Sequence, residues 1–341
     1  MIENYPNKRR MHCESGVLVN MMEYYGYEIS EPMVFGIGGG LYFLYFPWLK
    51  VQDFVLVVMR TKPTEVIRHF TKRMHIGYHE QTFGNDSIGA EKALDDLLAR
   101  NVPVGIVANL IGLKYLNDIG FELDYNGHHI TVVGKEGSKY IIADMDEKLP
   151  NDDLVTLDES YMRQVRFHGG ISAPHGRMFY IDPLQPGFGE HIDLRPAILE
   201  GLGEVCKNMI TIPFKYFGAK GIHYFANDLR KWHKKYSDDK IDYSLLWYYR
   251  LLEQAGTGGA GYRYMYADFL KESAELFQSE ALDKSSTLMH TAADVWRQFT
   301  VGCNRYINRS GTTLNELADI VDEAGNQEHE TFLKIKKEFL K

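Results

Sequence analysis

Three side chains of types used in nucleophilic catalysis occur along the chain in the order Cys, His, Asp. Cys13 lies near the N-terminus, a histidine doublet occupies positions 128 and 129, and Asp144 follows the apolar segment 140–143. In such chemistry a thiolate attacks a carbonyl carbon, an imidazole transfers the proton, and a carboxylate orients the imidazole. This set predicts a papain-like nucleophilic site. For Cys13 taken alone, the alternative is a small buried cysteine without a chemical role.

The residues after Cys13 have the pattern of a helix. Val17, Met21, Tyr24 and Tyr25 fall on one helical face, and Gly26 follows them as a stop. Cys13 therefore lies at the expected start of a helix, where the aligned backbone N–H groups favour a thiolate. The cations of residues 8–10 precede it and would add positive potential.

The histidines lie at one end of an expected hairpin. Residues 130–133 form a β-branched strand closed by Gly134, residues 135–138 read as the turn, and residues 139–143 return as the partner strand. Asp144 then lies at the same end as the histidines and can fix the tautomer of one of them. The alternative is an exposed histidine pair beside an ordinary aspartate at the end of a strand.

Several further motifs accompany these segments. They are His12–Ser15, Gly26, Ser30–Glu31, Phe35–Leu41, Gly127–Gly134 with Asp144, Gly256–Arg263 and Asp268–Leu270. In these motifs the chain resembles the butirosin biosynthesis protein H family, whose N-terminal domain is usually followed by a helical domain of unknown function. The resemblance implies a papain-like cysteine-peptidase-type domain turned to acyl transfer. In such a reaction an aminoacyl group moves from an acyl carrier protein to an aminoglycoside amine in antibiotic biosynthesis.

The resemblance also implies roles for individual residues. Cys13 matches the nucleophile and Asp144 the orienting acid. The catalytic histidine of papain-like hairpins commonly stands six residues before the glycine that ends the strand, which favours His128 over His129. Papain-like sites also use a glutamine six residues before the cysteine as an oxyanion donor. That position is Asn7 here, a shorter amide.

The bulk composition excludes several classes of protein. The chain has 341 residues, 45% hydrophobic and 25% charged, as in a soluble globular protein long enough for two domains. Its net charge of −8 argues against nucleic acid as a partner. No segment resembles a signal peptide, and the longest apolar stretch, residues 41–49, is too short to span a bilayer. Three widely spaced cysteines fit a reducing compartment, so we expect a cytoplasmic protein without a membrane partner.

The element pattern predicts an α+β domain followed by a mainly α-helical domain. Helices are expected at 63–74, 88–100 and 158–167, and strands at 54–59, 102–107, 130–133, 139–143 and 178–181. The Pro- and Gly-rich residues 182–189 are the best linker candidate, which gives domains at 1–182 and 190–341. A helix start is also expected at residues 30–32, and the glycines among residues 36–40 indicate close backbone approach.

Other candidate residues lie in the helical part. Arg230 and Lys231 belong to the strongest basic cluster, which could dock an acidic carrier protein, although a solvated helix face explains it equally well. Arg263 directly follows a glycine-rich run and is a candidate acceptor-binding residue. Cys206 and Cys303 fall on apolar helix faces and are expected in the core. The 13 histidines show no metal-ligand spacing, so we expect no metal and no cofactor.

The residues leave three functions open. The first is an acyltransferase that moves an acyl group from a thioester to an amine. The second is a cysteine peptidase or amidase with the same three residues, because the two reactions differ only in the second step. The third is a non-catalytic binding protein on the same scaffold. The second domain favours transfer, because a helical addition could exclude water. Nothing in the sequence indicates an oligomeric state.

Overall fold

The computed structural model describes residues 1–51, 54–117, 124–146, 149, 152–185, 187–189 and 192–340. The chain forms two compact units, and each is assembled from two separate parts of the sequence. Unit 1 comprises Met1–Val34 and Thr71–Ile192, and unit 2 comprises Phe35–Phe70 and Asp193–Lys341. The chain therefore passes from one unit to the other three times. The passages fall within α2 (Glu31–Ile37), within α3 (Glu65–Arg73) and before α7 (Arg195–Cys206).

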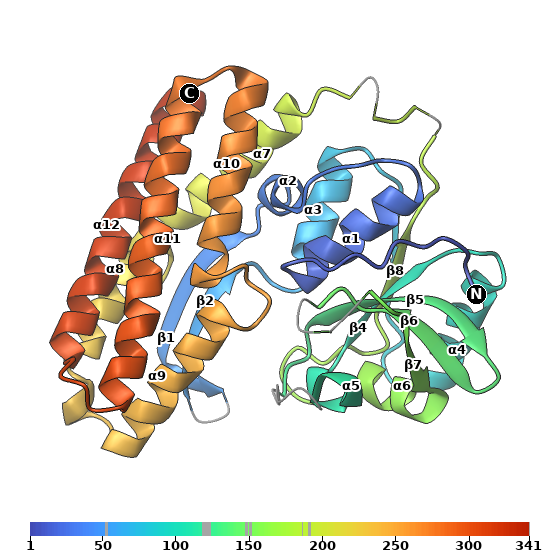
Figure 1. Ribbon diagram of the computed structural model, residues 1–341, viewed down its shortest axis with the longest axis horizontal. Helices are drawn as coiled ribbons and strands as arrows, with labels where there is room; N and C mark the ends of the chain where they lie inside the picture. Colours follow the sequence, from blue (N-terminus) through green and yellow to red (C-terminus); the bar gives the residue numbers. More distant parts are fainter. Residues whose placement is uncertain are drawn as a thin grey trace. The chain divides into compact units, whose positions relative to one another are not determined.

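Unit 1 is built on a six-stranded sheet with the strand order β3-β8-β4-β5-β6-β7, in which each neighbouring pair is antiparallel (Figure 1). The strands are β3 (Tyr78–Gln81), β4 (Val104–Ala108), β5 (His128–Glu136), β6 (Lys139–Ala143), β7 (Val155–Asp158) and β8 (Met178–Ile181). The four inner strands were expected from the sequence. The two edge strands, β3 and β7, were not, because each has only four residues and no run of apolar side chains.

The β5–β6 hairpin differs from its expected form at Gly134. The strand does not end there but continues to Glu136, and the turn contains Gly137 at φ +57°. The register shifts between Val132 and Gly134, so Val133 is the extra residue of a bulge that directly precedes Gly134. A Cβ at Gly134 would come within 2.7 Å of the Met1 Cα, because the N-terminus packs there. The glycine therefore permits close backbone approach.

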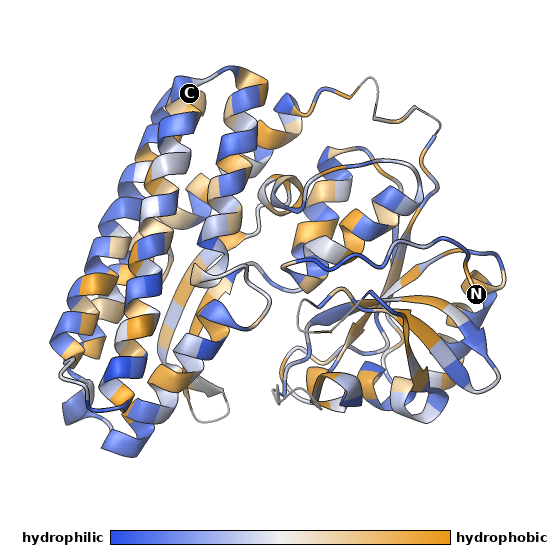
Figure 2. Cartoon of the chain, in the orientation of Figure 1, coloured by the Kyte–Doolittle hydropathy of each residue, from blue (hydrophilic) through white to orange (hydrophobic). Residues whose placement is uncertain are grey.

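The helices of unit 1 are α1 (Cys13–Tyr24), α4 (Ser87–Leu98), α5 (Lys114–Asn117), α6 (Glu159–Arg166) and the 3₁₀ turn η1 (Leu110–Gly112). Most of α1 is buried, including Val17, Leu18 and Met21, and the helix packs against β5. The sheet strands β4 to β6 are strongly hydrophobic in Figure 2, which is the pattern of strands covered on both faces. This core fixes the first residue of α1 relative to the first residue of β5.

Unit 2 is mainly helical and contains one β-hairpin. Its elements are β1 (Leu41–Val51), β2 (Phe54–Arg60), α7, the π-helix η2 (Lys207–Thr211), α8 (Gly218–Leu229), η3 (Trp232–Lys234), α9 (Asp238–Glu253), η4 (Ala260–Tyr262), α10 (Arg263–Phe277), α11 (Glu280–Ile307) and α12 (Leu314–Phe339). Helices α10, α11 and α12 pack side by side, with hydrophobic inner faces and hydrophilic outer faces (Figures 1 and 2). Cys206 and Cys303 are buried in this unit, as expected.

The α+β character of the N-terminal region and the helical character of the C-terminal region are confirmed. The spatial units nevertheless do not follow a single cut between residues 182 and 190, because residues 35–70 belong to the helical unit. The predicted close approach of the glycines is seen there, since a Cβ at Gly36 would lie 2.1 Å from the Phe269 ring. Among the helices of the described residues, none combines the length and apolarity needed to cross a membrane.

Candidate active site

Cys13 is the first residue of α1. The preceding residue, His12, is the N-cap, and its ring lies 3.5 Å from the backbone nitrogen of Ser15. Cys13 is partly exposed, whereas Cys206 and Cys303 are buried. Burial raises the pKa of the Cys206 thiol to about 12, so that thiol is unreactive near neutral pH. Cys13 is therefore the accessible thiol among the three.

The sheet brings His128 and Asp144 together. His128 pairs with Ala108 of β4, and Thr131 pairs with Ala143 of β6, so Asp144 emerges beside the start of β5. Nε2 of His128 lies 2.9 Å from Oδ2 of Asp144, and both side chains are buried. An ionised carboxylate is an acceptor only, so Nε2 carries the hydrogen in this bond. The Nδ1 atom of His128 then remains as the nitrogen for proton transfer.

The thiol of Cys13 adjoins both histidines. Its Sγ lies 4.0 Å from Nδ1 of His129, at the outer limit for a sulfur hydrogen bond, and 3.9 Å from the carbonyl oxygen of Gly127. Cys13 also interacts with the His128 ring strongly enough to raise its pKa. His128 is bonded to the Asp144 carboxylate, and Nδ1 of His129 lies 3.0 Å from the Gly127 carbonyl. The bond to Asp144 therefore makes His128 the candidate proton carrier.

The pKa values of the pair move in opposite directions. Burial by itself would lower the pKa of His128, but the Asp144 carboxylate and Cys13 hold it well above its usual range. Burial would likewise raise the pKa of Asp144, but the His128 ring, the backbone N–H of Asp146 and the Tyr115 hydroxyl lower it. The result is an imidazolium of His128 held against the Asp144 carboxylate.

Tyr115 is a site residue that sequence analysis missed. Its hydroxyl donates a hydrogen bond of 2.9 Å to Oδ2 of Asp144, the same oxygen that receives Nε2 of His128. The backbone N–H of Asp146 donates to Oδ1 at 3.1 Å, and Arg9 donates to the Asp144 backbone carbonyl. Tyr115 lies on the short helix α5, and no spacing in the sequence connects this helix to the hairpin.

Two family models match the chain. Residues 12–145 match the model described as Butirosin biosynthesis protein H, N-terminal, and residues 160–335 match the model described as Domain of unknown function (DUF4872). The chain belongs to the family that joins these two domains. This membership links the chain to butirosin biosynthesis proteins, and so to antibiotic biosynthesis. It suggests a biosynthetic enzyme. Among curated proteins, no sequence matches the chain.

The N-terminal match of this family member includes Cys13, His128 and Asp144, and Asp144 stands next to its last residue. The DUF4872 match begins at residue 160, in α6, although the chain passes to the helical unit only after Ile192. Residues 35–70 lie within the N-terminal match, but in space they belong to the helical unit. The boundaries of the two family matches therefore differ from the boundaries of the two compact units.

Asn7, at the expected oxyanion position, is directed elsewhere. Its Nδ2 donates hydrogen bonds of 3.0 Å to the backbone carbonyls of both Asp152 and Asp153. These bonds occupy both amide hydrogens, so Asn7 ties the N-terminal segment to that loop. The cations before Cys13 are also paired. Lys8 and Arg10 both bond Glu23, which offsets the positive potential that their positions in the sequence suggested.

Arg230 and Arg263 form salt bridges within the helical unit. These are the two arginines that the sequence suggested for binding a carrier or an acceptor. Arg263 is fully buried against Glu328, with Nε at 2.9 Å from Oε1 and Nη2 at 3.1 Å from Oε2. Arg230 bonds Asp319 at 2.6 Å and Asp322 at 2.7 Å. Lys231, the next residue, is exposed. The observed contacts of Arg263 are therefore structural, and of the three cations Lys231 is the most accessible to a partner.

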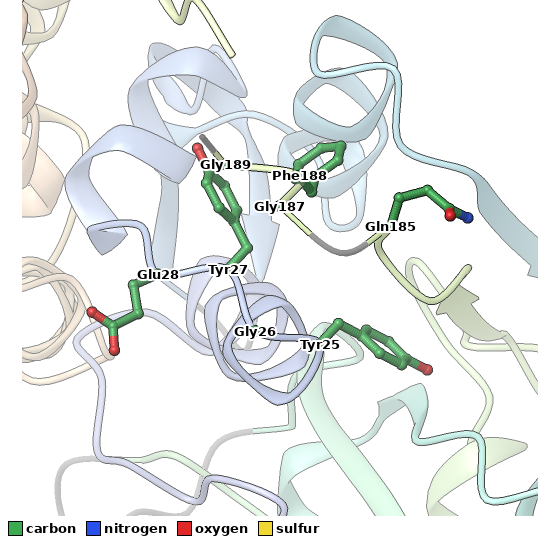
Figure 3. Close-up of a pocket in the computed structure, with 8 residues that line it drawn as sticks. All are labelled: Tyr25, Gly26, Tyr27, Glu28, Gln185, Gly187, Phe188 and Gly189. Atoms are coloured by element: carbon green, nitrogen blue, oxygen red, sulfur yellow. The ribbon is translucent and has the colours of Figure 1, made fainter. Parts of the chain in front are cut away.

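A surface pocket of about 550 Å³ lies in unit 1 (Figure 3). It is lined by Tyr25, Gly26, Tyr27, Glu28, Gln185, Gly187, Phe188 and Gly189. Tyr27 and Phe188 meet edge to face, with ring centroids 5.2 Å apart. The pocket thus joins the loop after α1 to the Pro- and Gly-rich segment, and none of Cys13, His128 and Asp144 lines it. Within the described part of the chain, no group of three or more His, Cys, Asp or Glu side chains is placed to hold a metal ion.

Proposed function

We propose that this protein is an acyltransferase that moves an acyl or aminoacyl group from a carrier-protein thioester to an amine through an acyl-enzyme on Cys13. The observation that carries the proposal is the buried His128–Asp144 hydrogen bond of 2.9 Å, made at the start of the strand where the Cys13 thiol adjoins His128. A nucleophile, a base and an orienting acid in contact are the requirements of covalent acyl transfer. Membership of an antibiotic-biosynthesis family supports a biosynthetic reaction rather than digestion of peptides.

In the first step, the proton of the Cys13 thiol already lies on Nδ1 of His128, which is then an imidazolium, and the Cys13 sulfur attacks the thioester carbonyl carbon. The new carbon–sulfur bond forms, the bond between the acyl carbon and the carrier sulfur breaks, and His128 returns the proton to the departing thiolate. The products are a Cys13 thioester and a free carrier thiol. The raised pKa of His128 suits this step, because the ring holds the proton until the leaving group needs it.

In the second step, an amine attacks the Cys13 thioester. The nitrogen–carbon bond forms, neutral His128 takes a proton from the attacking nitrogen, and the Cys13 sulfur leaves with its electron pair. The proton passes to that sulfur, so the cycle ends with an amide and the Cys13 thiol. Asp144 keeps Nε2 protonated and holds the ring in one orientation throughout, as an orienting acid does. No cofactor enters the balance of either step.

The peptidase or amidase alternative uses water in place of the amine and shares the first step. The distinguishing experiment loads Cys13 with a simple acyl thioester, identifies the adduct by intact mass, and follows its decay with and without candidate amines. Transfer predicts a long-lived acyl-enzyme that an amine discharges to an amide. Rapid discharge to water, unchanged by any amine and matched by cleavage of peptides, would establish the hydrolase instead.

Two control variants make the experiment specific. Cys13→Ala is expected to take up no acyl group, while Cys206→Ala, which alters a buried thiol, is expected to load like the wild type. An adduct on Cys13→Ala would move the nucleophile to another residue. If the wild type itself takes up no acyl group from any thioester, the non-catalytic binding protein becomes the better description.

A further inference from the structure

A buried glutamate holds the segment that leads into Cys13. Glu31, the first residue of α2, accepts the backbone N–H of Met11 through Oε2 at 2.8 Å. Its other oxygen, Oε1, accepts the backbone N–H of His12 at 2.8 Å and the hydroxyl of Ser15 at 3.0 Å. Only 5% of Glu31 is exposed. All these partners lie in unit 1, on the last two residues before the helix and on its first turn.

These bonds fix the nucleophile from both sides along the chain. Met11 and His12 precede Cys13 directly, and Ser15 follows it by two residues. Ser15 donates its hydrogen to Glu31, and its oxygen also lies 3.0 Å from Nδ1 of His12. The carboxylate, the hydroxyl and the ring form one buried network around the turn that carries the thiol. Rotation of that turn would break several of these hydrogen bonds together.

We infer that Glu31 is a positioning residue for Cys13: its carboxylate sets the backbone path into α1 so that the thiol meets His128. This inference rests on the proposed function, because it concerns the same nucleophile. A carboxylate with so little exposure needs several donors to offset its loss of hydration, and here two backbone N–H groups and one hydroxyl provide them. Space-filling alone does not require a carboxylate at this position.

The variant Glu31→Gln separates positioning from packing. Glutamine has nearly the volume of glutamate, so a space-filling role predicts no change. It keeps one acceptor oxygen and places an NH₂ group against a backbone N–H, so the positioning role predicts a displaced Cys13. A misplacement of about 1 Å is enough to reduce the rate about a hundredfold. We expect the rate of Cys13 alkylation and kcat to fall about ten- to a hundredfold, with KM nearly unchanged.

The experiment measures the iodoacetamide labelling rate of Cys13 by peptide mapping in the full-length protein, together with thermal unfolding. Glu28→Gln is the matched control, because Glu28 is an exposed glutamate in the segment that leads into α2, and this variant should label at the wild-type rate. Ser15→Ala should give a smaller loss, and the double variant Glu31→Gln/Ser15→Ala should lose less than the product of the two single losses, because both act through one hydrogen bond. Cys206 and Cys303 should stay unlabelled throughout, which reports that the fold is retained.

The outcomes separate this inference from the proposed function. If wild-type Cys13 labels slowly and forms no acyl-enzyme, the proposed function fails. If wild-type Cys13 labels quickly and Glu31→Gln labels at the same rate with unchanged kcat, only the positioning role is overturned. A lower kcat accompanied by labelling of Cys206 would mean that Glu31 supports folding in general, and would also overturn the inference.

Discussion

Each unit of this protein contains a buried pair of oppositely charged side chains, and these two pairs differ in what surrounds them. In unit 1, His128 and Asp144 meet 2.9 Å apart beside a partly exposed thiol. In unit 2, Arg263 and Glu328 form a bidentate pair, and Glu328 also receives Nε1 of Trp296 at 2.6 Å. The remaining donors of Arg263 bond the carbonyls of Met59, Gly261 and Tyr42. The first pair has a proton to move and the second does not.

Burial and charge by themselves therefore do not identify a catalytic pair. An arginine stays protonated at any working pH and all its donors here are occupied, so the Arg263–Glu328 pair can only hold the unit together. His128 can change its protonation state, and one of its ring nitrogens adjoins a nucleophile. The comparison is testable, because changes in one pair should affect turnover and changes in the other should affect stability.

The largest effect is expected at the nucleophile. Cys13→Ala should reduce turnover by roughly 10⁴-fold or more, since the covalent route is lost, while the midpoint of thermal unfolding stays within a few degrees. Steady-state kinetics and thermal melts measure the two quantities. Cys206→Ala should show the reverse pattern, a lower melting temperature with turnover retained. Residual activity above a few per cent in Cys13→Ala would place the nucleophile elsewhere.

The next effect distinguishes the two histidines. His128→Ala should lower kcat by about 10²–10⁴-fold, the usual contribution of a general base, and His129→Ala should lower it less. The reason is that His128 is bonded to Asp144, whereas Nδ1 of His129 faces the Gly127 carbonyl. Single-turnover acyl transfer measures both variants. The opposite ranking would assign proton transfer to His129 and leave His128 as its support.

In unit 2 the expected effect is on stability. Glu328→Ala should lower the free energy of unfolding by about 3–5 kcal/mol, because it leaves the Arg263 guanidinium buried without its counter-ion. Acyl loading per folded molecule should remain at the wild-type level. Urea denaturation gives the first quantity, and Glu330→Ala is the control, since its exposed pair with Lys334 is worth at most about 1 kcal/mol. A Glu328→Ala protein of wild-type stability would contradict a structural role for the pair.

The smallest effect is a shift in pH dependence. His128 has a raised pKa, so its imidazolium is lost as the pH rises through that value, and turnover should fall on this alkaline limb. Asp144→Asn removes the carboxylate that raises the pKa, so the limb should move to lower pH. A pH profile of kcat/KM measures the shift. An alkaline limb that stays in place in Asp144→Asn would show that a different group titrates there.

The same pair makes stability depend on pH with a defined sign. The contribution of His128 is complete below the unfolded-state pKa of about 6.5 and is lost above its raised folded pKa. The contribution of Asp144 is present above about 3.9 and is lost as the pH falls through its lowered folded pKa. The difference in unfolding free energy between wild type and Asp144→Asn should therefore be greatest at about pH 4–6.5.

Sequence patterns located most of the secondary structure, because the inner strands and the helices carry strong apolar periodicity. The hairpin expected from the sequence also placed a histidine and Asp144 at the same end of its two strands, β5 and β6. The expectation of His128 over His129 depended on Gly134 as the end of the strand, and that strand end was wrong. Tyr115 and Glu31 reach the site from elements distant along the chain, and a single sequence does not report such contacts. Nothing in the sequence assigned residues 35–70 to the helical unit.

Residues 35–70 belong to unit 2, although the rest of that unit begins only at residue 193. This separation in the sequence has a consequence for folding during synthesis. The β1–β2 hairpin forms hydrogen bonds with residues of unit 2 that are translated much later. The backbone N–H of Tyr45 donates to the Tyr216 carbonyl, and the Tyr248 hydroxyl donates to the Val55 carbonyl. At about 5–20 residues per second, the ribosome needs on the order of ten seconds to supply them. During that delay, the aromatic run from Leu41 to Leu49 lacks the side chains of α8 and α11 that pack against it in the native unit. A nascent chain arrested after residue 192 should therefore bind chaperones through this hairpin, and release of such chains without chaperone contact would show that the hairpin is protected in another way.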